Sequence, residues 1–149
     1  GGNLLDFLGY YAYDRATSTD VMEDVQVPNT PALYDDPAMR TLLYYFLYDM
    51  TEHTGAVLEP TYSYLRVYKK GDVLHRHTDK KVCEYSVSIT LKREQADDIW
   101  PLCLETSDVH KVCLEEGDGL IYKGVENPHW RDKFEGERLA QVFLHYVRR

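Results

Sequence analysis

Hydrophobic residues recur at helical spacing in one stretch of the first 60 residues. Met39, Leu42, Leu43, Phe46, Leu47 and Met50 fall three or four positions apart, as on one face of a helix. Asp36-Pro37 suits the start of this helix, since Asp caps helix N-termini and Pro fits the first turn. Gly55 suits its end. We therefore expect an amphipathic helix over Pro37–His53 that covers a sheet, within an otherwise mixed helical and irregular segment.

From Thr61 onward the pattern changes to short β-type segments. The candidate strands are Thr61–Tyr68, Val73–His77, Cys83–Lys92, Leu102–Glu105, His110–Leu114, Gly119–Tyr122 and Leu139–Tyr146. Turn-forming pairs such as Gly71-Asp72 and Gly117-Asp118 separate them. This order favours an all-β sandwich or barrel buttressed by helix over a parallel α/β sheet. We expect a single domain over 1–149, in which 1–60 packs on a barrel core formed by 61–149.

Composition and charge narrow the class of protein. The chain has 149 residues, 44% of them hydrophobic, which is typical of a soluble globular domain. Its net charge of −8 works against binding to nucleic acid or to an anionic membrane surface. The longest apolar segment, Leu42–Tyr48, is much shorter than the roughly 20 residues of a membrane span.

Two further observations suggest the compartment. The three cysteines, Cys83, Cys103 and Cys113, lack close pairs and read as ordinary buried thiols in a reduced environment. The chain opens without the basic and apolar run of a secretory signal. We therefore expect a cytoplasmic protein.

His77-Thr78-Asp79 is the strongest candidate for chemistry. Two potential ligands separated by one residue project to the same side of an extended chain, so one metal can reach both. His129, 50 residues after Asp79, can supply a third ligand. Two histidines and one carboxylate form the facial triad of non-haem iron(II) oxygenases. The alternative is a solvated His-x-Asp on a strand, without a metal.

The surrounding sequence adds a resemblance. Tyr68 precedes His77 by nine residues, and Arg138 follows His129 by nine. With this order and spacing, the chain from about Thr61 to Val147 resembles the 2-oxoglutarate- and iron(II)-dependent oxygenases, in particular the prolyl-hydroxylase-like branch. The resemblance implies a double-stranded β-helix, the jelly-roll barrel of that family, with flanking helices.

The same resemblance implies cofactors and roles. Iron(II) would be bound by His77, Asp79 and His129, and 2-oxoglutarate would be the cosubstrate. Arg138 would pair with the far carboxylate of 2-oxoglutarate, which suits the fork of a guanidinium. Tyr68 would wall or hydrogen-bond the cosubstrate, and Thr90 maps loosely to a further contact. The implied activity is hydroxylation of a peptidyl or small-molecule substrate, with release of succinate and carbon dioxide.

Candidate substrate contacts follow from strand alternation. Tyr62, Tyr64, Arg66 and Tyr68 share one face of their strand, so Tyr64 and Arg66 face the metal cavity if Tyr68 does. Arg66 would then meet either an anionic substrate group or a structural acid. Trp130, bulky beside the distal histidine, would shape the pocket mouth. His75, a near neighbour of His77, reads as solvated, and His145 as structural.

Two alternative functions remain open on the sequence. One is a cupin-like metalloprotein that does not use 2-oxoglutarate, for which Arg138 is only a charge on the barrel surface. The other is a non-catalytic jelly-roll binding module, in which Trp100 and Trp130 form a ligand platform. Release of succinate from 2-oxoglutarate separates the three possibilities. The identity of the substrate is beyond the sequence.

Overall fold

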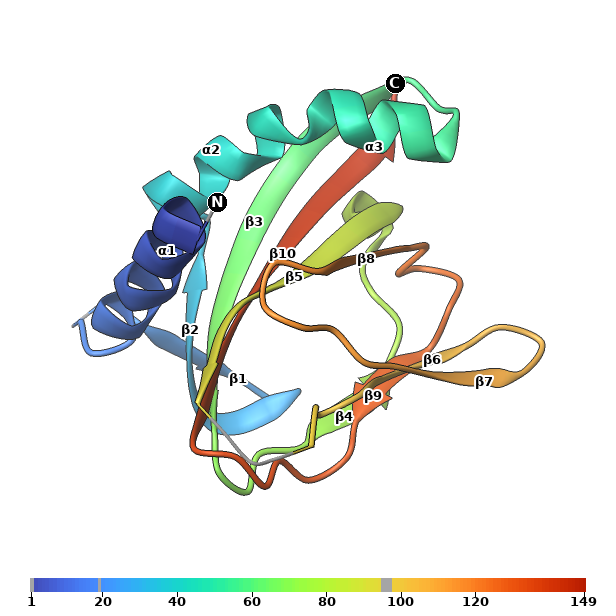
Figure 1. Cartoon of the computed structure of the whole chain (residues 1–149). Coiled ribbons are helices and arrows are strands. Elements are labelled where there is room, and N and C mark those ends of the chain that lie inside the picture. The colour runs from blue at the N-terminus through green and yellow to red at the C-terminus, as the bar shows by residue number, and fades with distance from the viewer. Residues whose placement is uncertain (1, 19, 95–97) are drawn as a thin grey trace.

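Two antiparallel sheets face each other in this protein, as Figure 1 shows. The structure, a computed structural model, describes residues 2–18, 20–94 and 98–149. The helices are α1 (Gly2–Arg15), α2 (Pro37–Tyr45), α3 (Leu47–Thr54) and a 3-10 turn, η1 (Lys81–Cys83). The strands are β1 (Met22–Asp24), β2 (Val27–Tyr34), β3 (Leu58–Lys69), β4 (Leu74–His77), β5 (Tyr85–Glu94), β6 (Leu102–Glu105), β7 (Val109–Val112), β8 (Gly119–Tyr122), β9 (His129–Arg131) and β10 (Arg138–Arg148).

The topology is that of a jelly roll. Within the described residues, the large sheet has the strand order β1-β2-β3-β10-β5-β8 and the small sheet has the order β4-β9-β6-β7. After β3 the chain passes back and forth between the two sheets. The small sheet lies on the concave side of the large one, and the three α-helices lie on its convex side (Figure 1). The space between the sheets is therefore the interior of a barrel.

Strand alternation divides the core into two layers. On β10, Ala140, Val142, Leu144 and Tyr146 face the helices and pack with residues such as Met39 and Leu43. The other face of β10 points into the barrel, where Leu139 packs with Tyr68 and Trp100. This places the long central strands β3 and β10 between an apolar outer layer and a more polar interior.

The expected helix over Pro37–His53 is present, but it is two helices. Asp36 caps α2 by accepting hydrogen bonds from the backbone N–H groups of Ala38 and Met39, and Gly55 ends α3 with a φ of 70°. Phe46 lies between them with a ψ of 3°, outside the helical range, so the helix axis breaks there. No sequence signal marks that break.

The first 60 residues also contain two strands that the sequence did not predict. β1 is only three residues long and largely exposed, and β2 contains Pro28 and Pro31, which lack the N–H donor of a regular strand. They form one edge of the large sheet, where β2 pairs with β3 and β1 pairs with β2. The expectation of a helical and irregular preface is therefore corrected: this segment also forms part of the barrel wall. None of the described helices is both long and apolar enough to cross a membrane.

Candidate metal centre

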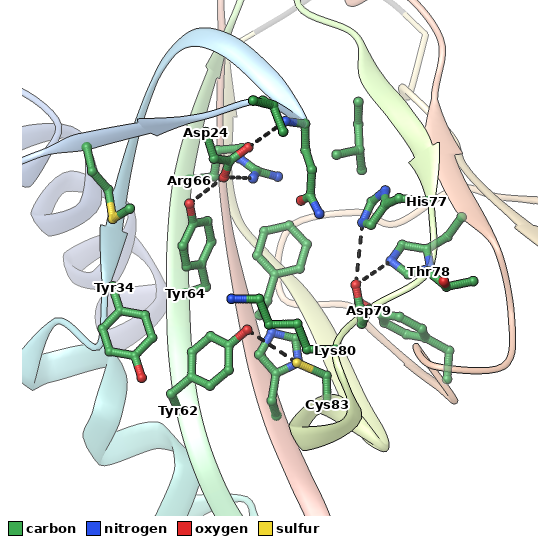
Figure 2. A pocket seen from close by; sticks show the side chains of 18 residues that line it. Asp24, Tyr34, Tyr62, Tyr64, Arg66, His77, Thr78, Asp79, Lys80 and Cys83 are labelled. Carbon is green, nitrogen blue, oxygen red and sulfur yellow. Dashed lines mark hydrogen bonds and ion pairs between the residues drawn. The ribbon is translucent and has the colours of Figure 1, made fainter.

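Register between two short strands brings the candidate ligands together. β4 pairs antiparallel with β9, and His77 stands opposite His129. Their rings lie 4.3 Å apart, centre to centre. Asp79 follows β4 and places its Oδ1 3.4 Å from Nε2 of His77 and 3.3 Å from Nε2 of His129 (Figure 2). The structure thus gathers all three residues of the His-x-Asp…His pattern at one point.

The contact made by Nδ1 of each imidazole determines which tautomer the ring adopts. Nδ1 of His77 lies 2.6 Å from the carbonyl oxygen of His75, and Nδ1 of His129 lies 2.8 Å from that of Asn127. A carbonyl oxygen can only accept, so both Nδ1 atoms carry the hydrogen, and the neutral rings present lone pairs on Nε2. Metal-ligating histidines are held in this way.

Asp79 completes a donor set that fits a divalent cation. Its Oδ2 is buried and has no hydrogen-bond partner in the part of the chain that the structure describes. Its backbone N–H donates to the carbonyl of Gly124, which fixes the residue against the turn before β9. Two imidazole lone pairs and a carboxylate that point at one another repel unless a metal cation or a proton lies between them. Two nitrogens and one carboxylate oxygen match non-haem iron(II).

A cavity of about 390 Å³ opens beside this donor set, between the two sheets. His77, Asp79 and His129 line one side of it. Figure 2 shows Asp24, Tyr64 and Arg66 on the opposite wall, and Tyr34 with Tyr62 below them. The rings of Tyr34 and Tyr62 are stacked, with centroids 4.9 Å apart. The cavity therefore has a metal-binding side, a charged wall and an aromatic border.

The charged wall is a buried ion pair. Nη2 of Arg66 lies 2.6 Å from Oδ2 of Asp24, and the hydroxyl of Tyr64 donates to the same carboxylate oxygen. Arg66 is only 3% exposed. Burial by itself would raise the pKa of Asp24, but the charge of Arg66 and these hydrogen bonds outweigh burial and lower it. Arg66 and Tyr64 thus face the cavity, as strand alternation predicts, and Arg66 does meet an acid.

Two residues near Asp79 were missed as site residues. Cys83 and His145 line the cavity, and each offers a ligand atom within 4.8 Å of one on Asp79. Burial raises the pKa of Cys83 to about 11 and lowers that of His145 to about 4, so both are uncharged at neutral pH. The alternation of β10 could have found His145, because it shares the inner face with Phe143.

Two residues expected at the site, Arg138 and Thr90, lie elsewhere. The side chain of Arg138 is on the outer face of β10, 3.9 Å from the ring centre of Tyr13 on α1 and paired with Glu94 at 2.7 Å. The spacing from His129 led to this expectation, but it does not tell which face of the strand a residue occupies. The alternation of side chains along β10 turns position 138 away from the barrel. Thr90 is buried and donates to Oε1 of Gln141, off the cavity wall.

Trp130 and Tyr68 also differ from expectation. Trp130 alternates with His129 and Arg131 on β9, so it faces outward, where the guanidinium of Arg76 lies over its ring. Trp130 is therefore not a pocket residue. Tyr68 is fully buried behind the cavity wall, and its hydroxyl lies 3.3 Å from Nη1 of Arg66. It is near the site without lining it.

Comparisons with known proteins give a structural likeness. No family model matches the sequence, and no curated protein matches it. Among solved structures, a Pseudomonas putida prolyl-4-hydroxylase aligns with a TM-score of 0.81 and 16% identity, over 100% of this chain and 88% of the other. A viral collagen prolyl hydroxylase from Paramecium bursaria Chlorella virus-1, solved with 2-oxoglutarate, gives 0.72 and 11%, over 98% and 90%.

A third similar structure contains a small molecule in addition to 2-oxoglutarate. HygX from Streptomyces hygroscopicus, with nickel, 2-oxoglutarate and hygromycin B bound, aligns with a TM-score of 0.72 and 16% identity, over 99% of this chain and 79% of the other. At these identities the likeness establishes the fold. The expectation of a double-stranded β-helix with flanking helices is confirmed.

Proposed function

We propose that this protein is an iron(II)- and 2-oxoglutarate-dependent oxygenase that hydroxylates a small-molecule or peptidyl substrate. The observation that carries the proposal is the convergence of three lone-pair donors, His77, Asp79 and His129, inside a double-stranded β-helix. Iron(II) with 2-oxoglutarate supplies oxidation of a C–H bond by dioxygen, with release of succinate and carbon dioxide.

The residues of this chain would hold the metal and shield it. Three protein ligands on one side leave the other coordination positions open for a cosubstrate and dioxygen. The backbone carbonyls of His75 and Asn127 hold both imidazoles in the tautomer that binds metal. Buried Tyr122, whose ring lies 4.9 Å from that of His129, packs against the centre from inside the barrel and excludes water there.

The substrate would enter along the aromatic border of the cavity. Tyr34 and Tyr62 offer flat, partly apolar surfaces at this border. The hydroxyl of Tyr64 is bonded to Asp24, so Tyr64 would offer mainly its ring to a ligand. These features suit an apolar or planar group on a metabolite or a peptide.

One observation favours a second candidate. The cupin-like alternative, a metalloenzyme that does not use 2-oxoglutarate, expects Arg138 to be a surface charge, and the structure places it outside the barrel. The two candidates share the metal centre and differ in the cosubstrate. They therefore require a test that follows 2-oxoglutarate itself.

The decisive experiment measures succinate. Iron(II)-loaded protein is incubated with 2-oxoglutarate, ascorbate and dioxygen, and the succinate formed is compared with that formed by His77→Ala protein. We expect slow succinate release by the wild-type protein alone and faster release in a metabolite or peptide extract, together with products heavier by one oxygen atom. Oxygenated products without succinate would favour the cupin-like alternative. Metal binding with neither product would contradict both.

A further inference from the structure

The inner face of β10 carries no cation near the metal centre. Its residues are Leu139, Gln141, Phe143 and His145, which alternate with the outward-facing residues. The amide of Gln141 is occupied, because it donates to Oγ of Ser88 and accepts from Thr90. The ring of His145 is also occupied, because its Nδ1 lies 2.7 Å from Oγ of Ser86. A dicarboxylate in the barrel must therefore find its cation on another strand.

Two arginines from other strands, one in each sheet, point into the barrel instead. Arg66 on β3 stands opposite Gln141 in the register of the large sheet and lines the cavity. Arg131 on β9 lies on the same side of its strand as His129 and is only 1% exposed. Their guanidinium carbons lie 5.6 Å and 5.7 Å from the ring centre of Tyr68. The two cations thus share one neighbour in the interior.

Arg131 has no carboxylate partner in the part of the chain that the structure describes. Nη1 donates to the carbonyl oxygen of Trp100, but the buried Nε and Nη2 have no partner in the described residues. An isolated buried cation is costly, and such groups normally have an anionic partner.

Arg66 has donors to spare on the cavity side. A guanidinium has five N–H groups, and the bonds to Asp24 and Tyr68 use two of them. The hydroxyl of Tyr68 accepts one of these bonds from behind the cavity wall. Asp24 holds the guanidinium in place against the rings of Tyr64 and Phe143.

Charge balance indicates what is missing. Arg66 and Arg131 are two buried cations, and Asp24 is the carboxylate that pairs with them in the described residues, so one buried positive charge is left without a described counterion. Lys80 also lines the cavity, but it is exposed. A divalent metal on Asp79 likewise leaves one positive charge at the metal centre. A ligand with two carboxylates would neutralise both of these positive charges. One carboxylate would bind near the metal and the other would bind at the arginines.

Building on the proposed function, we propose that the distal carboxylate of 2-oxoglutarate binds at this arginine pair. It accepts hydrogen bonds from Arg66, which lines the cavity, and Arg131, behind the buried ring of Tyr68, balances its charge. Arg138, on the outer face of the same sheet, takes no part. The arginine that binds the distal carboxylate therefore lies on β3, which is adjacent to β10. The second positive charge comes from β9, which also carries His129.

The test compares two 2-oxo acids on protein loaded with redox-inert zinc(II). 2-Oxoglutarate has a distal carboxylate and 2-oxopentanoate does not, so the ratio of their dissociation constants, measured by calorimetry, isolates the distal subsite. We expect the wild-type protein to prefer 2-oxoglutarate by roughly 30-fold or more, as for a charge pair removed from water. Arg66→Gln should reduce the preference to a few-fold, and Arg66→Lys should recover part of it.

Arg131→Met gives a second signature. This substitution removes the unmatched cation at similar volume, so it should raise the melting temperature of the cosubstrate-free protein while weakening 2-oxoglutarate binding. A residue with a purely structural role would lower the melting temperature. If Arg131→Met and Arg66→Gln fold but keep the wild-type preference, the arginine-pair assignment is wrong.

Arg138→Ala is the matched control, because it removes a guanidinium of the same kind from the outer face. It should keep the wild-type preference, and loss of preference there would return the anchor to Arg138 and overturn the inference. If the zinc-loaded wild-type protein binds neither 2-oxo acid, the proposed function fails as well. If it binds 2-oxoglutarate without needing Arg66 or Arg131, only the inference fails.

Discussion

Gly124 leaves no room for a side chain beside Asp79. A Cβ built on Gly124 would lie 2.1 Å from Oδ2 of the Asp79 carboxylate, far inside van der Waals contact. The backbone carbonyl of Gly124 also accepts the N–H of Asp79 at 2.8 Å. The glycine therefore sets the position of the carboxylate from two directions, although the two residues lie far apart in the sequence.

Gly124→Ala should therefore disable the metal centre without touching a ligand. The new methyl group must push the Asp79 carboxylate away from Nε2 of His77 and His129, which weakens metal binding by roughly 10- to 100-fold, the usual cost of losing the support of a ligand. Calorimetric titration with manganese(II) measures it. Glu126→Ala, an exposed change in the same turn, is the control. Equal affinities in the two variants would contradict the packing argument.

Two histidines on β4 give a matched pair for the ligand assignment. His77→Ala removes a donor and should weaken metal binding by roughly 100-fold or more, since even losses outside the coordination sphere cost about 10- to 100-fold. His75→Ala, two residues away and exposed, should leave affinity unchanged, because only its backbone carbonyl is used. Equal losses in both variants would mean that His77 is not a ligand.

The Asp24–Arg66 pair predicts a pH dependence of stability. The pKa of Asp24 is lower in the folded protein than its ordinary value of 3.8, so the pair stabilises the fold above about pH 4. That contribution is lost as pH falls through the lowered pKa. Asp24→Asn should cost about 2 kcal/mol of unfolding free energy at neutral pH, less than the about 3–5 kcal/mol of a fully buried pair, since Asp24 is partly exposed.

Urea unfolding from neutral to acid pH measures this effect. The difference between the wild-type protein and Asp24→Asn should shrink below about pH 4. A difference that stays constant down to about pH 2 would show that the carboxylate acts through packing and not through its charge.

The three thiols should differ in reactivity. Cys113 is exposed, so the expectation of three buried thiols is wrong for this residue. Cys83 and Cys103 are buried, and burial raises the pKa of both. Only a thiolate reacts readily with iodoacetamide, so Cys113 should be alkylated first and Cys83 slowly. Peptide mass mapping against time, with Cys113→Ser as the control, identifies the site. Rapid labelling of Cys83 in the native protein would mean that its thiol is ionised or that the cavity admits the reagent freely.

The sequence predicted the parts of this fold that have strong local signals. β6 and β8 have the expected bounds, and both ends of the α2–α3 segment match the signals at Asp36 and Gly55. β9 has three residues and no periodicity of its own, so only its pairing with β4 and β6 makes it a strand. Short strands held by their neighbours carry little local signal.

Site residues could be predicted from the sequence where a motif and its spacing identify them. They could not be predicted where the role depends on which face of a strand the side chain occupies. His77 and His129 follow from motif and spacing. Arg138 does not, because one step along β10 moves a side chain from the interior to the outer surface. Asp24 was also unpredictable, since its partner Arg66 lies on a different strand and no local pattern links them.

The wall formed by β1 and the turn after it has an evolutionary consequence. Met22, Asp24, Val25, Gln26 and Tyr34 line the cavity, and all come from one stretch of 13 residues near the start of the chain. The metal ligands come from later segments. A single recombination event that exchanges this stretch would therefore give a new specificity while inheriting the old chemistry. The exchanged segment must bring an acid to position 24, or Arg66 loses its partner.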